Sequence, residues 1–95
     1  METILVVAPR FQLGQLAATP NALEQIPNLE IIAALNRHVQ CDWGELDAED
    51  KSANDRAFAQ GGRLFSAYFS TAKVKFWIIT EADRSITTVL LPEDY

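Results

Sequence analysis

Residues 74–91, VKFWIITEADRSITTVLL, decide the fold of this chain. Two runs rich in aromatic and β-branched residues, 74–80 and 85–91, lie on either side of the polar insert 81–85, whose last residue, Ser85, is also the first of the second run. This pattern is typical of two strands joined by a turn. The preceding run 63–69, RLFSAYF, has the same character and is followed by a short polar break. Because short connections join antiparallel neighbours, the three runs predict a three-stranded antiparallel meander.

The middle run of this meander carries apolar side chains on both of its faces. Successive strand residues point to opposite sides, so Phe76 and Ile78 point one way, while Trp77 and Ile79, with Lys75, point the other. We therefore expect helices to cover one face. The N-terminal segment, a second copy of the chain or a partner would cover the other. The core residues predicted from these strands are Phe76, Trp77, Ile78, Val89 and Leu90.

The first part of the chain indicates a strand, an extended piece and a short helix. The apolar run 3–9, TILVVAP, predicts a buried N-terminal strand that ends at Pro9. The mixed run 10–20 then allows a second short extended segment. Thr19 and Pro20 are typical of a helix start, because threonine caps free amides and proline suits the first helical position. A short helix is therefore expected at residues 20–26.

Two further helices are expected in the middle of the chain. The run 29–41, LEIIAALNRHVQC, has apolar residues at steps of three and four, and Asn28 is the candidate cap. The run 47–62, DAEDKSANDRAFAQGG, predicts another helix that is capped by Asp47 and stopped by its two glycines. Its apolar face is thin, so one side should stay in contact with water.

The fold class predicted from these patterns is α+β. It has an N-terminal strand, two to three helices and then the C-terminal three-stranded antiparallel meander. A chain of 95 residues that is 48% hydrophobic can bury one core, so residues 1–95 are expected to form a single domain.

The charge and the cysteine content narrow the function classes. A formal net charge of −5 argues against direct nucleic-acid binding, which relies on lysine and arginine to neutralise phosphates. The single cysteine, Cys41, excludes an internal disulfide. The apolar run Ile4 to Ala8 is shorter than the ~7–15 residues of a signal-peptide core. No run approaches the ~20 apolar residues of a membrane helix, so a cytoplasmic protein with no membrane partner is expected.

Metal and thiol chemistry have little support in the sequence. His38, Cys41 and Asp42 fall close together, but a zinc site needs three or four ligands and the chain has one histidine and one cysteine. The neighbouring carboxylates Asp42 and Glu45 would raise the pKa of the Cys41 thiol, which disfavours a nucleophilic role. We expect no bound metal. His38 is expected to pack against the apolar side of its helix, with Asp42 as a hydrogen-bond partner.

Other catalytic and cofactor patterns are absent from the sequence. There is no glycine-rich phosphate loop, and Ser85, His38 and Asp83 lack the local motif of a serine hydrolase. We therefore expect no cofactor and no catalytic residue, and we interpret the insert 81–85 as a hairpin turn. An enzyme of unrecognised type that uses His38 at a subunit interface is the alternative.

The run 42–50, DWGELDAED, joins an aromatic residue to a cluster of acids. It does not fit a calcium-binding EF-hand loop, because Gly44 occupies the third position. The run is either a solvated helix start or a docking patch, and Trp43 is either an interface anchor or a core residue. The candidate partner-binding residues are Asp42, Trp43, Glu45, Asp47, Glu49 and Asp50.

Four stretches together resemble a known protein family. They are RFQLGQLAATPNALE (10–24), RHVQCDWGEL (37–46), GGRLFSAY (61–68) and FWIITEADRSITTVLLPEDY (76–95). The family consists of small uncharacterised bacterial proteins carried on plasmids and integrated conjugative elements, labelled plasmid-related proteins and sometimes a type I restriction methylation subunit.

The chain departs from the family pattern at two places and does not fit the methylation label. Asn21 stands where a glycine commonly follows the proline, and the run 70–76 lacks the usual Asp-Gly turn. An adenine methyltransferase needs a cofactor-binding fold and an NPPF-like motif, and neither is present in these 95 residues. The resemblance implies a mobile-element setting and supplies no catalytic residue.

These observations favour a non-enzymatic accessory protein of a mobile genetic element that acts by binding another protein. A narrower alternative is an anti-defence inhibitor, of anti-restriction or anti-CRISPR type, that blocks a nuclease or DNA-binding surface. A homodimer is a further alternative. A nucleic-acid-binding regulator is a third class, and it would use Arg10, Lys73, Lys75 and Arg84.

Overall fold

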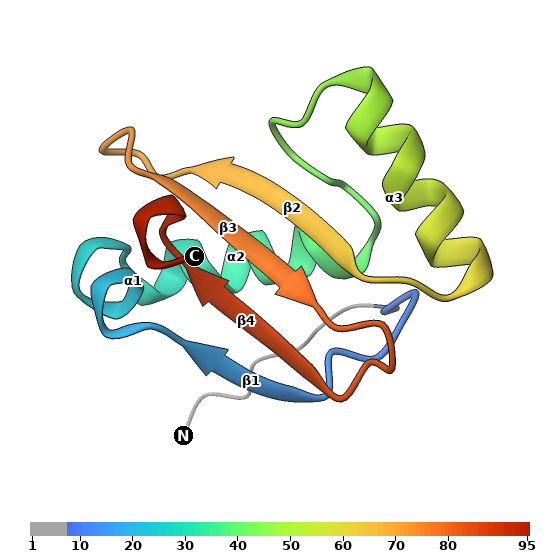
Figure 1. Ribbon diagram of the computed structural model, residues 1–95. Helices are drawn as coiled ribbons and strands as arrows, with labels where there is room; N and C mark the ends of the chain where they lie inside the picture. Colours follow the sequence, from blue (N-terminus) through green and yellow to red (C-terminus); the bar gives the residue numbers. More distant parts are fainter. Residues whose placement is uncertain (1–7) are drawn as a thin grey trace.

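The structure is a computed structural model that describes residues 8–95. Four strands form one sheet in the order β1-β4-β3-β2, with three α-helices and a C-terminal 3₁₀ turn around it (Figure 1). The elements are β1 (Gln15–Ala18), α1 (Pro20–Gln25), α2 (Asn28–Val39), α3 (Ala48–Gln60), β2 (Leu64–Phe69), β3 (Lys75–Thr80), β4 (Ile86–Leu90) and η1 (Pro92–Asp94).

The α+β prediction is confirmed, with a correction to the sheet. The three C-terminal runs form β2, β3 and β4, which are antiparallel neighbours. The sheet is not a meander alone, because β1 joins it as a fourth strand parallel to β4 and makes it mixed. Most of the predicted N-terminal strand 3–9 lies outside the described residues, and the extended piece after it is the strand that the structure contains.

Gly14 explains how β1 approaches β4. The amide of Gln15 donates to the carbonyl of Ser85 at 2.9 Å and starts the parallel pairing. Gly14 has a φ of +67°, and a Cβ added there would lie 2.4 Å from the carbonyl oxygens of both Arg84 and Ser85. Only a residue without a side chain allows this contact.

The helices follow the predicted signals except at the two ends of α2. This helix ends at Val39, two residues before the predicted end, because Cys41 has a φ of +63° that is not helical. The side chains of Thr19 and Asp47 each accept a backbone amide three residues later, at the starts of α1 and α3. Gly61, with a φ of +81°, ends α3. The predicted cap Asn28 is wrong: Asn28 is the first residue of α2, and Pro27 holds the cap position without a side-chain bond. Proline has the extended φ and ψ that a cap position needs, which moves the helix start by one residue.

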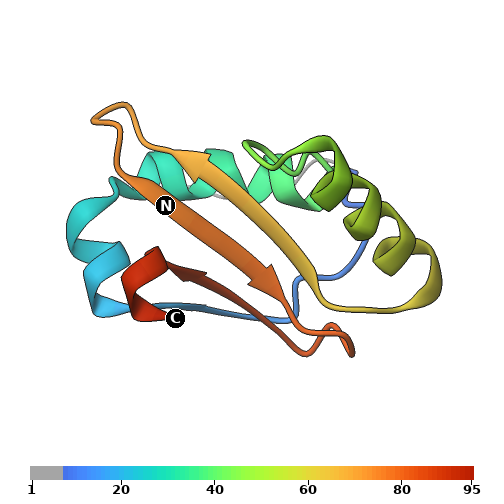
Figure 2. The same ribbon diagram turned by 45° about the horizontal axis from the view of Figure 1, so that its top comes forward.

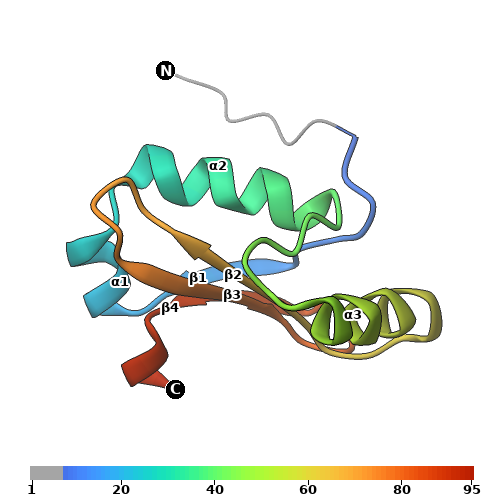
Figure 3. The ribbon, with the colours of Figure 1, turned by 90° about the horizontal axis from the view of Figure 1, so that it is seen from above.

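The main core lies between the sheet and helices α1 and α2. Figure 3 shows α2 on one side of the sheet and the C-terminal η1 on the other. The predicted core positions Phe76, Ile78, Val89 and Leu90 are buried, as expected. The core cluster consists of Ala22, Ile26, Ile31, Ala34, Leu35, Tyr68, Phe76, Ile78, Val89 and Leu91.

The second face of the sheet is covered in part by the chain's own aromatic side chains. Trp77, predicted to be in the core, is only half-buried on this face. Its ring centroid lies 4.9 Å from that of Phe65 and 5.8 Å from that of Tyr95. Ile79 on the same face is 3% exposed. Tyr95, at the C-terminal end of the described chain, therefore covers part of this face. We had expected the N-terminal segment, a second copy or a partner to cover it.

A polar contact fixes η1 to the start of α1. The carboxylate of Asp94 accepts hydrogen bonds from Thr19 Oγ1 at 2.6 Å and from Asn21 Nδ2 at 2.8 Å. The bond from Thr19 is the main reason why the pKa of Asp94 is lowered. The same threonine thus caps α1 and holds the segment that follows β4.

The outer edge of β2 is satisfied by two other parts of the chain. The amide of Ala67 donates to the carbonyl of Trp43 at 3.2 Å, and the carbonyl of Ala67 accepts from the amide of Glu45 at 2.7 Å. The side chain of Asn54 bonds to both main-chain groups of Phe65, at 2.5 and 3.1 Å. Within α3 only Asn54 is buried. Helix α3 lies beside β2 (Figure 2), and the side chain of Asn54 bonds it to the main chain of this strand.

The substitution Asn54→Ala should lower the free energy of unfolding by about 1–3 kcal/mol, because it removes two hydrogen bonds and leaves main-chain groups of Phe65 unpaired. Urea unfolding at neutral pH measures the effect. The matched control is Ser52→Ala, which changes an exposed residue of the same helix and should have little effect. Equal stability of the two variants would contradict this attachment of α3.

Candidate functional site

His38 lies in a buried chain of hydrogen bonds. Its Nδ1 is 2.5 Å from Ser66 Oγ, and its Nε2 is 2.9 Å from Thr80 Oγ1. Thr80 Oγ1 lies 2.7 Å from Thr87 Oγ1, and Thr87 donates to the carbonyl of Leu13 at 2.7 Å. These side chains, which we call the His38 chain, connect α2, β2, β3, β4 and the segment before β1.

The environment of His38 suits a structural role. The side chain is 0% exposed, and the rings of Phe11 and Trp43 pack against it with centroids 5.3 and 5.8 Å away. Burial, with a smaller effect of Arg84, lowers the pKa of His38 to about 3, so the ring is neutral at pH 7. The predicted bond to Asp42 is wrong, because both ring nitrogens already bond to hydroxyl groups. With no exposed atom, His38 gives no support to the enzyme alternative.

Cys41 and its neighbours form no metal centre in the structure. Within residues 8–95, no group of three or more His, Cys, Asp or Glu side chains is placed to hold a metal ion. Cys41 is partly buried, and this burial is the main reason why the pKa of its thiol is raised. A raised pKa keeps the sulfur protonated at neutral pH and lowers its reactivity.

The polar insert between β3 and β4 forms the predicted hairpin turn. The amide of Glu81 donates to the carbonyl of Ile86 at 3.0 Å, and the carboxylate of Asp83 accepts the amide of Ser85 at 3.0 Å. The guanidinium of Arg84 donates to the carbonyl of Gly62 at 2.5 Å. These side chains hold the main chain of the turn in place.

The serine, histidine and aspartate considered above are not assembled into a triad. Ser85 and Asp83 are exposed at the turn, whereas His38 is buried and bonds to Ser66 and Thr80. Hydrogen bonds from Ser85 lower the pKa of Asp83, so this carboxyl stays ionised and acts on the turn.

Two of the six candidate partner-binding residues, Trp43 and Asp42, bond to other side chains of the same chain. Trp43 is 3% exposed, and its Nε1 donates to Asp55 Oδ1 at 3.0 Å. Its ring also stacks on Phe11 with centroids 6.4 Å apart. Of the two readings that the sequence left open, the structure places Trp43 in the core. Asp42 forms a two-point ion pair with Arg37, at 2.7 and 3.2 Å.

The other four candidates, Glu45, Asp47, Glu49 and Asp50, are exposed at the start of α3. The ion pairs among residues 8–95 are Arg37–Asp42 and Arg63–Glu81, so none of these four acids takes part in one. Asp50 lines a groove of about 340 Å³, which we call the α3 groove. It is lined by Leu46, Asp50, Ala53, Asn54 and Phe65. The other three acids are neighbours in sequence of the lining residues Leu46 and Asp50.

The α3 groove continues into a row of aromatic rings. Phe65 is at its floor, and Trp77 and Tyr95 follow with ring centroids 4.9 and 5.8 Å apart along the row. The row lies on the sheet face away from α2. The sequence signal for it was present, because Phe65 and Trp77 alternate with the buried strand residues, but the contact between Phe65 and α3 had no sequence signal.

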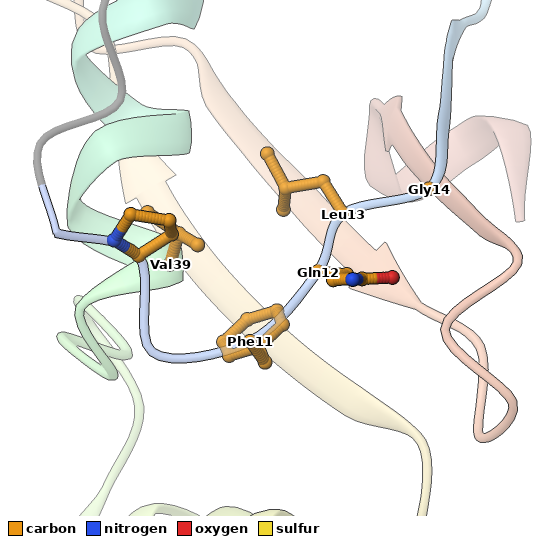
Figure 4. Close-up of a pocket in the computed structure, with 6 residues that line it drawn as sticks. Phe11, Gln12, Leu13, Gly14 and Val39 are labelled. Atoms are coloured by element: carbon orange, nitrogen blue, oxygen red, sulfur yellow. The ribbon is translucent and has the colours of Figure 1, made fainter.

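A second hollow, of about 370 Å³, lies between residues 9–14 and the end of α2. Figure 4 shows Phe11, Leu13 and Val39 around it, with Gln12 to one side. Pro9 and Gly14 complete the lining. This lining is almost entirely apolar and contains no charged or nucleophilic side chain. The hollow therefore provides no side chain for catalysis.

Comparisons with models of protein families, with curated proteins and with solved structures gave no match to this chain. Within the described part of the chain, no helix is both long enough and apolar enough to cross a membrane.

Replacing Trp43 by alanine should lower the free energy of unfolding by about 3–5 kcal/mol, the usual cost of emptying a buried aromatic site. Trp77→Ala is the comparison, and its cost should be smaller because Trp77 is half-buried. Urea unfolding of both variants measures the difference. A Trp43→Ala protein as stable as the unmodified chain would place Trp43 at an interface instead.

Stability should fall in acid because of His38. Its pKa is about 3 in the folded protein and about 6.5 when exposed, so the unfolded chain binds the proton first as the pH falls. Above pH ~6.5 both states hold a neutral His38, so its titration does not lower the free energy of unfolding. Between pH ~6.5 and pH ~3 the free energy of unfolding falls by up to ~1.4 kcal/mol per pH unit. Urea unfolding between pH 7.5 and 5 should show this slope.

The variant His38→Gln is the control for this pH effect. It lacks the titrating ring, so its stability should change much less between pH 7.5 and 5, whatever its absolute stability. Equal slopes in the two proteins would show that His38 is not held neutral in the fold.

Proposed function

We propose that this protein is a non-enzymatic accessory protein that binds another protein through the α3 groove. The observation that carries the proposal is a groove whose lining includes Leu46, Phe65 and Asp50. Asp50 belongs to a run of four exposed acids, Glu45, Asp47, Glu49 and Asp50, that form no ion pair within residues 8–95. Protein interfaces combine a desolvated apolar centre with a polar rim, and this surface has both parts.

The groove is held in a fixed shape by its own contacts. Asn54 binds the main chain of Phe65, and Asp47 caps α3 with a hydrogen bond of 2.8 Å to the amide of Asp50. A site that is already ordered loses less conformational entropy when a partner binds, which favours affinity. The apolar lining is only half-buried at Leu46 and Phe65, so a partner can still remove apolar area from water.

The narrower form of the proposal is an anti-defence inhibitor encoded on a mobile element. The mobile-element setting comes from the family resemblance. The acids of the groove favour this form, because the surfaces of nucleases that hold DNA are rich in lysine and arginine. Such an inhibitor would act by covering that surface.

Affinity purification of the tagged protein from its own host tests the proposal. The unmodified chain should retain a partner in stoichiometric amount, and the double variant Glu49→Gln/Asp50→Asn should retain at least about five-fold less. The control Glu24→Gln/Glu93→Gln removes the same charge at two other exposed positions and should retain the partner. Equal recovery by all three proteins, or no partner at low salt, would contradict binding through the α3 groove.

A further inference from the structure

We infer that the α3 groove binds a basic amphipathic segment of the partner. This segment inserts an apolar side chain between Leu46 and Phe65 and places a lysine or arginine beside Asp50. The inference rests on the proposed protein-binding function and specifies the chemistry of the partner. Three features support a basic amphipathic segment: the size of the groove, the charge around it and the aromatic row that continues from it.

The size of the groove fits part of a peptide. Its volume of about 340 Å³ has room for one or two side chains but not for a folded domain. Leu46, Ala53 and Phe65 provide the apolar contacts in it, and Asn54 already uses its amide on the main chain of Phe65. An apolar side chain therefore fits the part of the lining formed by Leu46, Ala53 and Phe65, whereas the carboxylate of Asp50 needs a polar partner.

The charge around the groove selects a cation. The run 45–51 carries four acids and one lysine, Lys51, which gives a formal net charge of −3. The first amides of α3 contribute a partial positive charge of only about +0.5, and Asp47 already caps one of them. Asp50 is the acid that lines the groove itself. A partner with an acidic segment would meet like charges here, whereas a basic one gains favourable interactions.

The aromatic row gives the segment a direction. Beyond Phe65, the rings of Trp77 and Tyr95 continue across the sheet face, and Tyr95 is 70% exposed. Arg63 at the far end is not a competing free cation, because it pairs with Glu81 at 3.7 Å and donates to Tyr95 Oη at 2.8 Å. A segment that lies along this row meets apolar rings on one side only, so it should be amphipathic.

Two synthetic peptides test the inference on the full chain. The first is a 14-residue peptide, roughly four helical turns, with leucines along one face and lysines elsewhere. The second has glutamate in place of every lysine. Backbone amide shifts from NMR titration report the binding site. We expect the lysine peptide to shift the amides of Leu46, Ala53 and Phe65, and the glutamate peptide to leave them unchanged.

Substitutions in the α3 groove and changes in salt concentration test whether its acids and Leu46 are responsible for peptide binding. The double variant Glu49→Gln/Asp50→Asn should raise the Kd of the lysine peptide at least about five-fold, and higher salt should weaken binding in the same direction. Leu46→Ala should also weaken it, while Glu24→Gln/Glu93→Gln should not. Shifts that map elsewhere, or equal affinity for the two peptides, would overturn the inference.

The failure of this inference can be told apart from failure of the proposed function. If the host partner is lost from groove variants but its contacting segment is acidic or uncharged, protein binding stands and the basic segment is wrong. If no partner is recovered, the proposed function itself fails. Self-association of the chain that the Leu46→Ala variant abolishes would identify a second copy as the occupant and would also overturn the inference.

Discussion

The buried ring of His38 is the constraint on which the rest of the structure depends. A neutral imidazole has two nitrogens that each need a partner, and burial without partners would cost several kcal/mol. Ser66 and Thr80 meet this need, and Thr87 extends the chain of bonds to the carbonyl of Leu13. Within residues 8–95, every buried side-chain nitrogen or oxygen has a hydrogen-bond partner. Helix α2 and strands β2, β3 and β4 are therefore fixed relative to one another by a polar network as well as by apolar packing.

The residues that look chemically active in the sequence are either buried or bonded to other parts of the chain. His38 is enclosed, and Trp43 donates its indole hydrogen to Asp55 inside the fold. The hairpin residues Asp83 and Arg84 bond to nearby main-chain groups. The described surface has instead a groove lined by apolar and polar side chains, and its Asp50 belongs to a run of four acids that form no ion pair among residues 8–95.

Much of the fold was predictable because its signals are local. Alternating apolar residues gave the three C-terminal strands, and caps at Thr19 and Asp47 gave two helix starts. Apart from local errors at the two ends of α2 and in the expected bond from His38 to Asp42, the differences concern contacts between residues far apart in sequence. The parallel pairing of β1 with β4 joins Gln15 to Ile86, and His38 meets Ser66 and Thr80 across 28 and 42 residues. For the candidate site, the acids of the surface were predictable, whereas the position of Phe65 beside them was not.

The side chain of Asn54 has a consequence for how this protein avoids uncontrolled assembly. An edge strand with free main-chain groups can recruit strands from other molecules and start aggregation. At Phe65, the amide group of Asn54 takes the place that a neighbouring strand would occupy, and the Trp43–Glu45 segment does the same at Ala67. The outward main-chain groups of Phe65 and Ala67 are therefore not free to pair with a strand from another molecule. A partner that reaches this side of the molecule must be recognised by its side chains, because its backbone has no free ladder there to join.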